Sequence, residues 1–346
     1  MLGSGIDLCS ASIGADVGRA ARWERVRVRE MGKQPREGEG GRVERRQRKG
    51  LTNLIDRATW LGPIMLAPAI LYILALIAFP FCLALLYSVS DVTTGSQTIA
   101  FAGLDNFKGI LESPTFHTAL KNTFIFTFTS QILVMVLAQI MALALQQTFP
   151  GKSVVRLLLL MPWVSPIALG TIGWKWMYDS LYSVINWTLQ ALHIIGPNTW
   201  PYWLGEPDLA MMAVILVHVW RMFPFATVIL LAGLTSLPQE VLEAASVDGA
   251  GFWRRLFQII LPMLRPIMTV AVLFGVVFTF ADMTVIYVLT RGGPYDSTHV
   301  LGSLAFFVGI IGGDLGEGAA ISIFLFPLLL VVAIVMLRIA RRAEVD

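Results

Sequence analysis

Long apolar segments alternate with short polar ones along most of the chain, and this pattern predicts the fold. A helix needs about 20 mainly apolar residues to cross the hydrocarbon of a bilayer, and six segments reach that length. We expect these spans at residues 61–87, 119–145, 154–177, 209–234, 266–289 and 315–337. Pro162 and Pro166 interrupt the third span. The pattern therefore predicts an all-α membrane protein with six transmembrane helices.

Composition supports the same class. Hydrophobic residues make up 56% of the chain, charged residues only 14%, and the mean hydropathy is +0.70. An ordinary soluble domain carries about 25% charged residues. Cys9 and Cys82 lie far apart, so they predict neither a disulfide framework nor a metal site. We assign residues 56–346 to a six-span domain.

The start of the chain differs from the rest. Residues 1–50 hold twelve Lys or Arg and seven acidic residues among few large apolar ones. This composition predicts a basic, disordered tail over residues 1–55, without the apolar centre of a secretory signal. A basic tail could bind nucleic acid or anionic lipid. A plain cytoplasmic tail, or a start codon assigned upstream of the real one, is the simpler interpretation, and we expect no nucleic-acid partner.

Positive charge in the short flanks of the spans predicts the orientation, because Lys and Arg gather on the cytoplasmic side. One side collects Arg57, Lys152, Arg156, Arg254, Arg255, Arg265, Arg338, Arg341 and Arg342. The opposite side has Lys108, Lys121 and Arg291, and residues 180–207 hold no Lys or Arg. We therefore expect a multi-pass membrane protein with both termini in the cytoplasm.

The connection at residues 235–265, which this orientation places in the cytoplasm, is longer than a helical bundle needs. Ser236 and Gln239 match a capping box. Ala244 and Ala245 offer a surface without bulky side chains, and Gly249 permits the positive φ that ends a helix. The pattern predicts two short helices hinged at Gly249. A loop that packs on its own spans and a docking element for a cytoplasmic partner are about equally compatible with it.

The same stretch, EAASVDGAGFWRRLFQIILPMLRP, resembles the cytoplasmic loop of permease subunits in binding-protein-dependent ABC importers. The matching residues are Glu243, Ala244, Ala245, Asp248, Gly249, Ala250, Leu261, Pro262 and Pro266. Three further segments are similar to the maltose and glycerol-3-phosphate branch: ALKNTFIFT (119–127), WRMFPFATVILLAGLTSLP (220–238) and VLTRGGPYDST (288–298). The resemblance covers residues 61–342.

This resemblance implies the ABC importer permease fold, with a coupling helix between the fourth and fifth spans. It implies that this helix contacts a separate ATPase subunit through Glu243, Ala244, Ala245, Asp248, Gly249 and Ala250. The implied partners are a second homologous permease chain, two copies of the ATPase and an extracytoplasmic solute-binding protein. A homodimer of this chain stays open as an alternative.

The sequence contains no recognisable catalytic motif. A phosphate-cradling loop reads GxxxxGK[ST], and the nearest candidate, at Lys152 and Ser153, has Gln146 in place of the first glycine. We find no zinc-protease motif and no nucleophile elbow. We therefore expect no catalytic residue, no metal and no cofactor, with ATP bound by partner subunits.

Ionisable residues inside spans are costly and usually face a cavity or a partner. Asp282 falls near the middle of the expected fifth span with Thr279 one turn before it, and Arg221 follows Trp220 in the fourth. With Tyr287, these groups suit a sugar, which needs hydrogen bonds and aromatic faces. A structural ion pair between Arg221 and Asp282 is the alternative. Three amides are expected to bond between helices: Asn122, Gln131 and Gln139.

The segment RGGPYDST lies on the expected outer side. Its Gly292, Gly293 and Pro294 are candidates for docking a solute-loaded binding protein, although a plain turn explains them equally well.

Together with the resemblance, these features predict the permease subunit of an ATP-driven sugar importer. The resemblance implies a disaccharide such as trehalose or maltose as substrate and a place in the bacterial cytoplasmic membrane. Glycerol-3-phosphate or another polyol is the alternative substrate. The alternative mechanism is a self-sufficient ion-coupled secondary transporter, for which we see no inverted repeat. A membrane-embedded enzyme lacks a catalytic cluster.

Overall fold

The computed structural model describes residues 62–96, 98–196 and 199–345. The expected tail over residues 1–55, Cys9 and Arg57 lie outside the described residues. The chain divides into two units, residues 1–78 and 79–346. In the first unit, the described residues form a helix that begins at Gly62 and includes the π-helical segment η1 (Leu74–Ala78).

The second unit is almost entirely helical. Its one small sheet pairs β1 (Ser90–Asp91) with β2 (Ala100–Phe101) in antiparallel register. In chain order its helices are α3 (Phe79–Ser88), α4 (Asp105–Glu112), α5 (Pro114–Gln146), α6 (Lys152–Val164), α7 (Ile167–Met177), α8 (Val184–Ala191), α9 (Pro207–Ser236), α10 (Gln239–Val247), α11 (Phe252–Arg255), η2 (Leu256–Ile260), α12 (Leu261–Ala281), α13 (Thr284–Leu289), α14 (Leu301–Phe306), η3 (Phe307–Ile311) and α15 (Leu315–Val345).

Five helical stretches in the described residues are long and apolar enough to cross a membrane, and one bent pair makes a sixth. The five are Gly62–Ser88, Pro114–Gln146, Pro207–Ser236, Phe252–Ala281 and Leu315–Ile339. The expected class, an all-α membrane protein with six spans, is confirmed.

The bent pair is the expected third span. Helices α6 and α7 meet at an angle of 96°. The backbone at Ser165 is extended, with ψ of 146°, and Pro166 follows it directly. Proline has no N–H to continue a helix and disfavours helical geometry in the residue before it. The expected interruption is therefore a sharp bend at Pro166, whereas Pro162 stays inside α6.

The expected fifth span, residues 266–289, is wrong as a single helix. Continuous helix begins earlier, at Phe252, and ends at Ala281. Asp282 is extended, with ψ of 97°, and a short separate helix, α13, follows it. The backbone N–H of Thr284 donates to the Asp282 carboxylate at 3.1 Å. Aspartate side chains compete with helical backbone bonds in this way, so the helix stops where the pattern of apolar residues continues.

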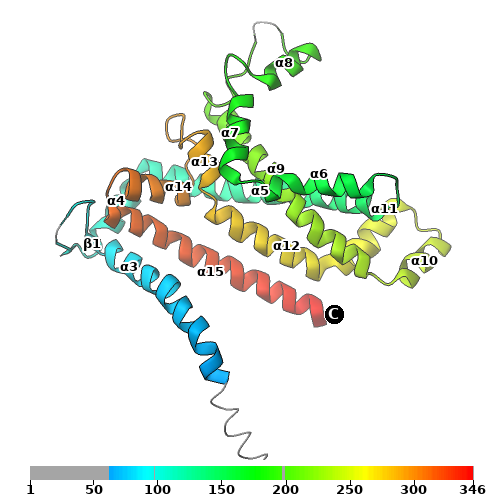
Figure 1. Ribbon diagram of the computed structural model, residues 1–346, viewed down its shortest axis with the longest axis horizontal. Helices are drawn as coiled ribbons and strands as arrows, with labels where there is room; N and C mark the ends of the chain where they lie inside the picture. Colours follow the sequence, from blue (N-terminus) through cyan, green and yellow to red (C-terminus); the bar gives the residue numbers. More distant parts are fainter. Residues whose placement is uncertain (1–61, 97, 197–198, 346) are drawn as a thin grey trace, which may run out of the picture. The chain divides into compact units, whose positions relative to one another are not determined.

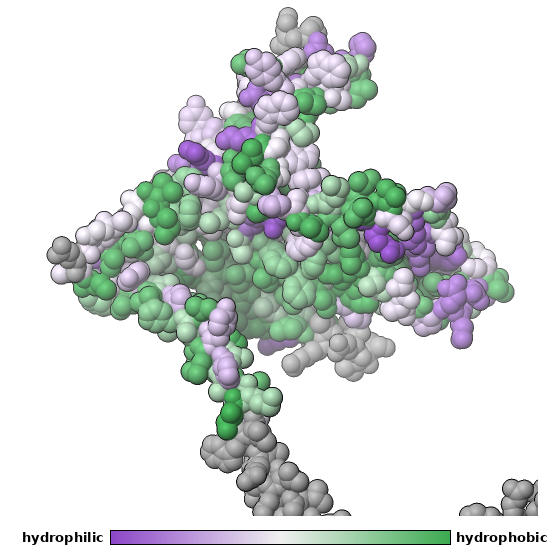
Figure 2. All heavy atoms as spheres, in the orientation of Figure 1, coloured by the Kyte–Doolittle hydropathy of each residue, from purple (hydrophilic) through white to green (hydrophobic). Residues whose placement is uncertain are grey.

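Helices α5 and α9 form the most extensive helix–helix contact in the described part of the chain, and α12 packs against both (Figure 1). Their buried side chains form the larger apolar core, which includes Phe126, Met222 and Leu230. A second core joins α4, α14 and the starts of α5 and α15 around Phe116 and Leu301. Hydrophobic residues dominate the surface over the long helices, while polar residues gather where α10 and α11 lie (Figure 2).

Two glycine positions let helices approach closely. A Cβ on Gly275 of α12 would overlap the Gln131 side chain of α5. A Cβ on Gly318 of α15 would overlap the backbone of Gly309 in η3 and would lie 3.0 Å from the Ala305 carbonyl oxygen. Small residues at such crossings are typical of membrane helices, because association there depends on van der Waals contact.

We predict that Gly318→Ala destabilises the protein, because the added methyl meets backbone atoms that cannot rotate away. Overpacking of this kind costs about 1–3 kcal/mol. The measurement is the melting temperature of the purified protein in detergent.

Gly109→Ala on α4 is the matched control, because a Cβ there meets nothing within 4 Å. We expect it to melt at or above the wild-type temperature, since alanine favours helix. Equal melting temperatures for both variants would show that the Gly309–Gly318 contact does not constrain the fold.

Candidate functional site

The segment between α9 and α12 contains one short helix and one sharp turn. Helix α10 ends at Val247, and Gly249 then adopts the left-handed conformation with φ of +73°. The backbone N–H of Ala250 donates to the Ala245 carbonyl at 2.9 Å, which closes the end of the helix. The expected turn at Gly249 is confirmed.

Two details expected for this segment are wrong. The Ser236 hydroxyl donates to the Gly233 carbonyl at 2.8 Å, within α9, so it forms no capping box with Gln239. Pro238 occupies the N-cap of α10 instead, without a side-chain bond. The expected second short helix is the beginning of the long helix that runs on to Ala281.

The exposed surface of α10 and its turn contains small, acidic and apolar residues. Glu243, Ala244, Asp248 and Gly249 are exposed, whereas Ala245 is 7% exposed and packs inward. Ala245 is therefore not part of the open surface, contrary to expectation. Another residue extends that surface: Val247 is 88% exposed. The sequence analysis did not identify Val247, although an apolar residue at the end of a polar helix was a signal for it.

A side-chain bond crosses the Gly249 turn and holds α10 against α11. Arg255 Nη1 donates to the Ser246 hydroxyl at 2.9 Å. The rings of Trp253 and Phe257 stack beside it, with centroids 5.9 Å apart. The short helix is thus attached to the base of the long helix by a polar contact and a rigid turn.

A buried charged network joins α9 to the break after α12. Asp282 Oδ2 accepts from His218 Nδ1 at 2.8 Å and from Arg221 Nη1 at 3.1 Å. The second imidazole nitrogen, Nε2, lies 3.0 Å from the Thr279 hydroxyl oxygen. The side chains of His218 and Asp282 are 1% and 4% exposed, whereas that of Arg221 is 24% exposed. We call these four residues the charged network.

The structure thus brings three of the five expected path residues together. Trp220 lies apart from them, with its ring 5.6 Å from that of Trp174. Tyr287 packs on Phe306 with 5.3 Å between ring centroids. Asp282 stands at the helix break and not near the middle of a span. His218 was missed, although it lies three residues before Arg221, a spacing that places both on one helix face.

Aromatic rings lie near the guanidinium group of Arg221. Its guanidinium carbon lies 5.9 Å from the ring centroid of Trp163 on α6. Trp163 in turn stacks on Phe225, with centroids 4.5 Å apart, and Phe278 contacts both rings edge-on. These three aromatic residues were also missed, because nothing in the local sequence distinguishes them from ordinary span residues.

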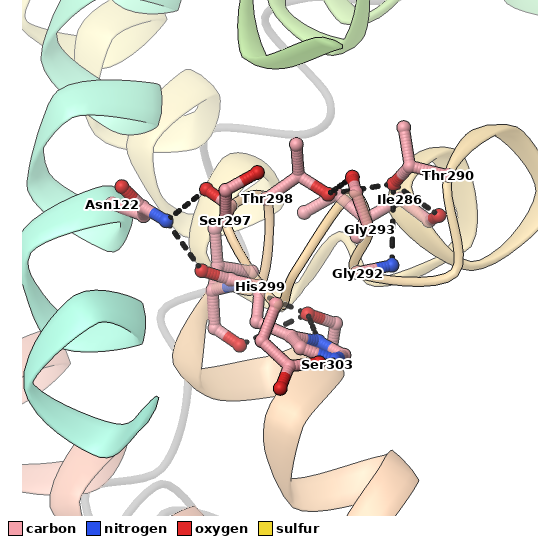
Figure 3. Close-up of polar contacts among 11 residues, drawn as sticks. Asn122, Ile286, Thr290, Gly292, Gly293, Ser297, Thr298, His299 and Ser303 are labelled. Atoms are coloured by element: carbon pink, nitrogen blue, oxygen red, sulfur yellow. Dashed lines mark hydrogen bonds and ion pairs between the residues drawn. The ribbon is translucent and has the colours of Figure 1, made fainter. Parts of the chain in front are cut away.

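The turn that follows α13 is held by side chains on both sides (Figure 3). The hydroxyl groups of Thr290 and Thr298 are 2.7 Å apart, and the Thr298 hydroxyl donates to the Gly293 carbonyl at 2.8 Å. Asn122 of α5 donates to the carbonyls of Ser297 and His299 at 2.6 and 3.1 Å. The Gly293–Pro294 peptide is cis.

Asn122 therefore bonds to this turn and not to another helix, which corrects the expectation. The other two amides, Gln131 and Gln139, also do not behave as expected, since their Nε2 atoms are buried with no partner among the described residues.

The backbone of the turn is left-handed at several residues that are not glycine. Arg291, Tyr295 and Asp296 have φ of 53°, 51° and 59°. Tyr295 is 93% exposed. Gly292 has φ of +89°, and a Cβ there would overlap the imidazole of His299. Of the three expected docking residues, Gly292 is thus required by the fold of the turn itself.

His299 lies beneath this turn with its side chain 4% exposed. Burial lowers the pKa of the imidazole, and the nearby Asp296 carboxylate opposes this only in part. Burial therefore favours the neutral form of the imidazole. Its Nδ1 lies 3.1 Å from the Ser303 hydroxyl on α14, which fixes the ring beneath the turn.

Comparison with known proteins agrees with these features. Residues 135–345 match the family described as binding-protein-dependent transport system inner membrane component. The trehalose/maltose transport system permease protein MalF of Thermococcus litoralis is 35% identical over 82% of this chain and 95% of its own. The trehalose transport system permease protein SugA of Mycobacterium tuberculosis is 33% identical over 80% and 87% of the two chains.

The fold also matches a solved structure. A chain of a bacterial ABC transporter involved in import of the acidic polysaccharide alginate superposes with a TM-score of 0.71 over 84% of this chain and 98% of that chain, at 22% identity. The family match covers more than half of the chain, and it includes α10, the Gly249 turn and the charged network. The chain therefore belongs to the family of binding-protein-dependent transport system inner membrane components, the multi-pass permeases of ABC importers.

Proposed function

We propose that this chain is a permease subunit of an ATP-driven importer of a disaccharide such as trehalose or maltose. The relatives named for those sugars support this substrate, with identities of 35% and 33% over at least 80% of the chain. The chain forms half of the path with a second, homologous permease chain. It lies in the bacterial cytoplasmic membrane with both termini inside.

The observation that carries the coupling role is the shape of α10 and its turn. Glu243, Ala244 and Asp248 form an exposed surface that Val247 extends, and the left-handed Gly249 ends it abruptly. A surface of this kind suits close approach to a cleft on an ATPase subunit. Two copies of that subunit bind ATP, and their closure moves α10 together with the long helix that begins at Phe252.

The solute path involves the exposed side of the charged network. Asp282 has both carboxylate oxygens engaged by protein groups, so its role is to position Arg221. Arg221 offers free donors, and the neighbouring rings of Trp163 and Phe225 offer faces for the C–H surfaces of a sugar. Of the expected path residues, Arg221 is the one best placed to meet solute.

An extracytoplasmic solute-binding protein delivers the sugar and docks on the turn that contains Gly292, Gly293 and Pro294. The support is the rigidity of the turn, which Asn122 and the Thr290–Thr298 contact hold in place. A pre-organised surface loses little conformational entropy when a partner binds.

The first test is to tag the chain in its own cell, solubilise the membranes gently and identify the co-purifying proteins. We expect an ATPase, a second six-span chain and a solute-binding protein. Calorimetry on that binding protein should show trehalose or maltose binding and no binding of glycerol-3-phosphate. A chain recovered alone that moves solute in vesicles without ATP would support the secondary transporter instead.

We predict that Gly249→Val abolishes ATP-coupled sugar uptake while the chain still inserts in the membrane. A Cβ at Gly249 meets nothing within 4 Å, so the defect arises from φ of +73°, which a β-branched residue strongly disfavours. Uptake of radiolabelled sugar by whole cells is the measurement.

Gly251→Val is the matched control, because Gly251 has φ of −65° and equally open surroundings. We expect it to retain at least half of wild-type uptake. If the two variants transport equally well, the left-handed turn has no role in coupling.

We predict that Asp282→Ala lowers the stability of the protein by about 3–5 kcal/mol, because it leaves the Arg221 guanidinium without its counter-charge and His218 Nδ1 without its buried partner. Thermal melting of the purified protein measures this. Asp105→Ala removes the acid of an exposed pair, with side chains 72% and 76% exposed, and should melt like wild type. A normal melting curve for Asp282→Ala combined with a raised KM for sugar would instead assign Asp282 to solute contact.

A further inference from the structure

A recess of about 450 Å³ lies beside the docking turn and has no role in the function described above. It is formed by the end of α4, the start of α5, the turn after α13, the segment α14–η3 and the start of α15. These segments lie at the end of the helices away from α10 (Figure 1). Phe116 and Phe307 provide apolar walls, and the polar lining is Ser113, Thr115, Asp296, His299, Asp314 and Glu317.

The recess is acidic and its charge is not compensated. Asp296, Asp314 and Glu317 line it, and no Lys or Arg does. Within the described residues, neither Asp314 nor Glu317 forms an ion pair. Asp314 Oδ1 accepts from the Glu317 backbone N–H at 2.8 Å, which leaves its other oxygen and the whole Glu317 carboxylate free. Like charges held together at a partly buried site are unfavourable unless a cation joins them.

His299 adds a buried polar side chain to this lining. Its side chain is 4% exposed, and Nδ1 lies 3.1 Å from the Ser303 hydroxyl oxygen. Nε2 lies 3.6 Å from Asp296 Oδ1 and has no partner within hydrogen-bond distance among the described residues.

The charged groups of the recess thus favour a cationic occupant. Three carboxylates accept hydrogen bonds and carry net negative charge. A guanidinium or ammonium group donates several hydrogen bonds and carries positive charge. A neutral sugar would satisfy hydrogen bonds but would leave the carboxylates uncompensated. The volume lies in the range of pockets that hold small ligands, which is ample for one long basic side chain.

We propose that the recess receives an arginine or lysine side chain of the solute-binding protein when that protein docks on the turn. Asp296 belongs to both features, since it lines the recess and follows Tyr295 in the turn. A protein that contacts the 93% exposed Tyr295 therefore sits beside the recess. This inference rests on the proposed function, and it names the chemistry by which the two proteins recognise each other.

The test uses the complete transporter in lipid nanodiscs and its purified binding protein. Binding is measured by biolayer interferometry at low and at high salt. The double variant Asp314→Asn/Glu317→Gln removes two charges from the recess with little change in shape. We expect its Kd to rise at least tenfold at low salt, and the salt dependence of binding to weaken, because fewer charges are left to screen.

Asp105→Asn/Glu112→Gln is the matched control, because it removes the same charge from exposed residues on α4 outside the recess. We expect its Kd to stay within twofold of wild type. Glu317→Gln alone should raise Kd at least threefold. This single variant replaces the double variant if the change at Asp314 lowers the melting temperature of the transporter.

Unchanged binding in both recess variants would overturn the proposal. The proposal would also be overturned if trehalose alone stabilised the wild-type transporter and did not stabilise the recess variant. The recess would then be a sugar site. A wild-type transporter that binds no solute-binding protein at all would refute the proposed function itself, and the recess proposal with it.

Discussion

The buried carboxylate of Asp282 is the constraint on which the arrangement of the helices depends. It accepts from His218 and Arg221 on α9 and from the backbone of Thr284 at the start of α13. One side chain therefore ends α12, starts α13 and binds both to α9. Because α9 leads directly to α10 and α13 leads to the docking turn, this carboxylate lies between the two surfaces proposed to meet partner proteins. Any change in the angle between α9 and α12 has to rearrange these bonds.

Helices and side-chain hydrogen bonds connect Asp282 to α10 on one side and to the turn after α13 on the other. Toward the proposed cytoplasmic side, helix continues without a break from Ala281 back to Phe252, and Arg255 ties its base to Ser246 of α10. Toward the other side, α13 leads into a turn that Asn122 anchors to α5. We propose that a displacement of α10 passes along this helix. Elements that move as units can carry coupling between distant sites.

Much of this fold could be predicted from the sequence because hydrocarbon imposes simple rules. Long apolar runs must be helical, proline at 166 marks the bend in the third span, and glycine at 249 marks a left-handed turn. The break at Asp282 could not be predicted, since no glycine or proline stands there and the apolar pattern continues to Leu289. The side-chain partners of Asp282, His218 and Arg221, lie more than sixty residues earlier in the chain. Such contacts depend on how α9 packs against α12, and a periodic pattern does not specify packing.

The distribution of charge also bears on which solute crosses. The recess at the proposed outer face carries three carboxylates without a paired Lys or Arg among the described residues, whereas the charged network holds one partly exposed arginine. Until a partner protein compensates them, these carboxylates repel anions in their vicinity. A phosphate ester would be repelled by the carboxylates of the recess. In the charged network it would meet a single arginine, Arg221, which is already bonded to Asp282. A neutral disaccharide meets no such barrier, and the donors of Arg221 and the rings of Trp163 and Phe225 suit its hydroxyl and C–H surfaces. We therefore propose a neutral sugar over glycerol-3-phosphate as the solute, in line with the relatives named for trehalose and maltose.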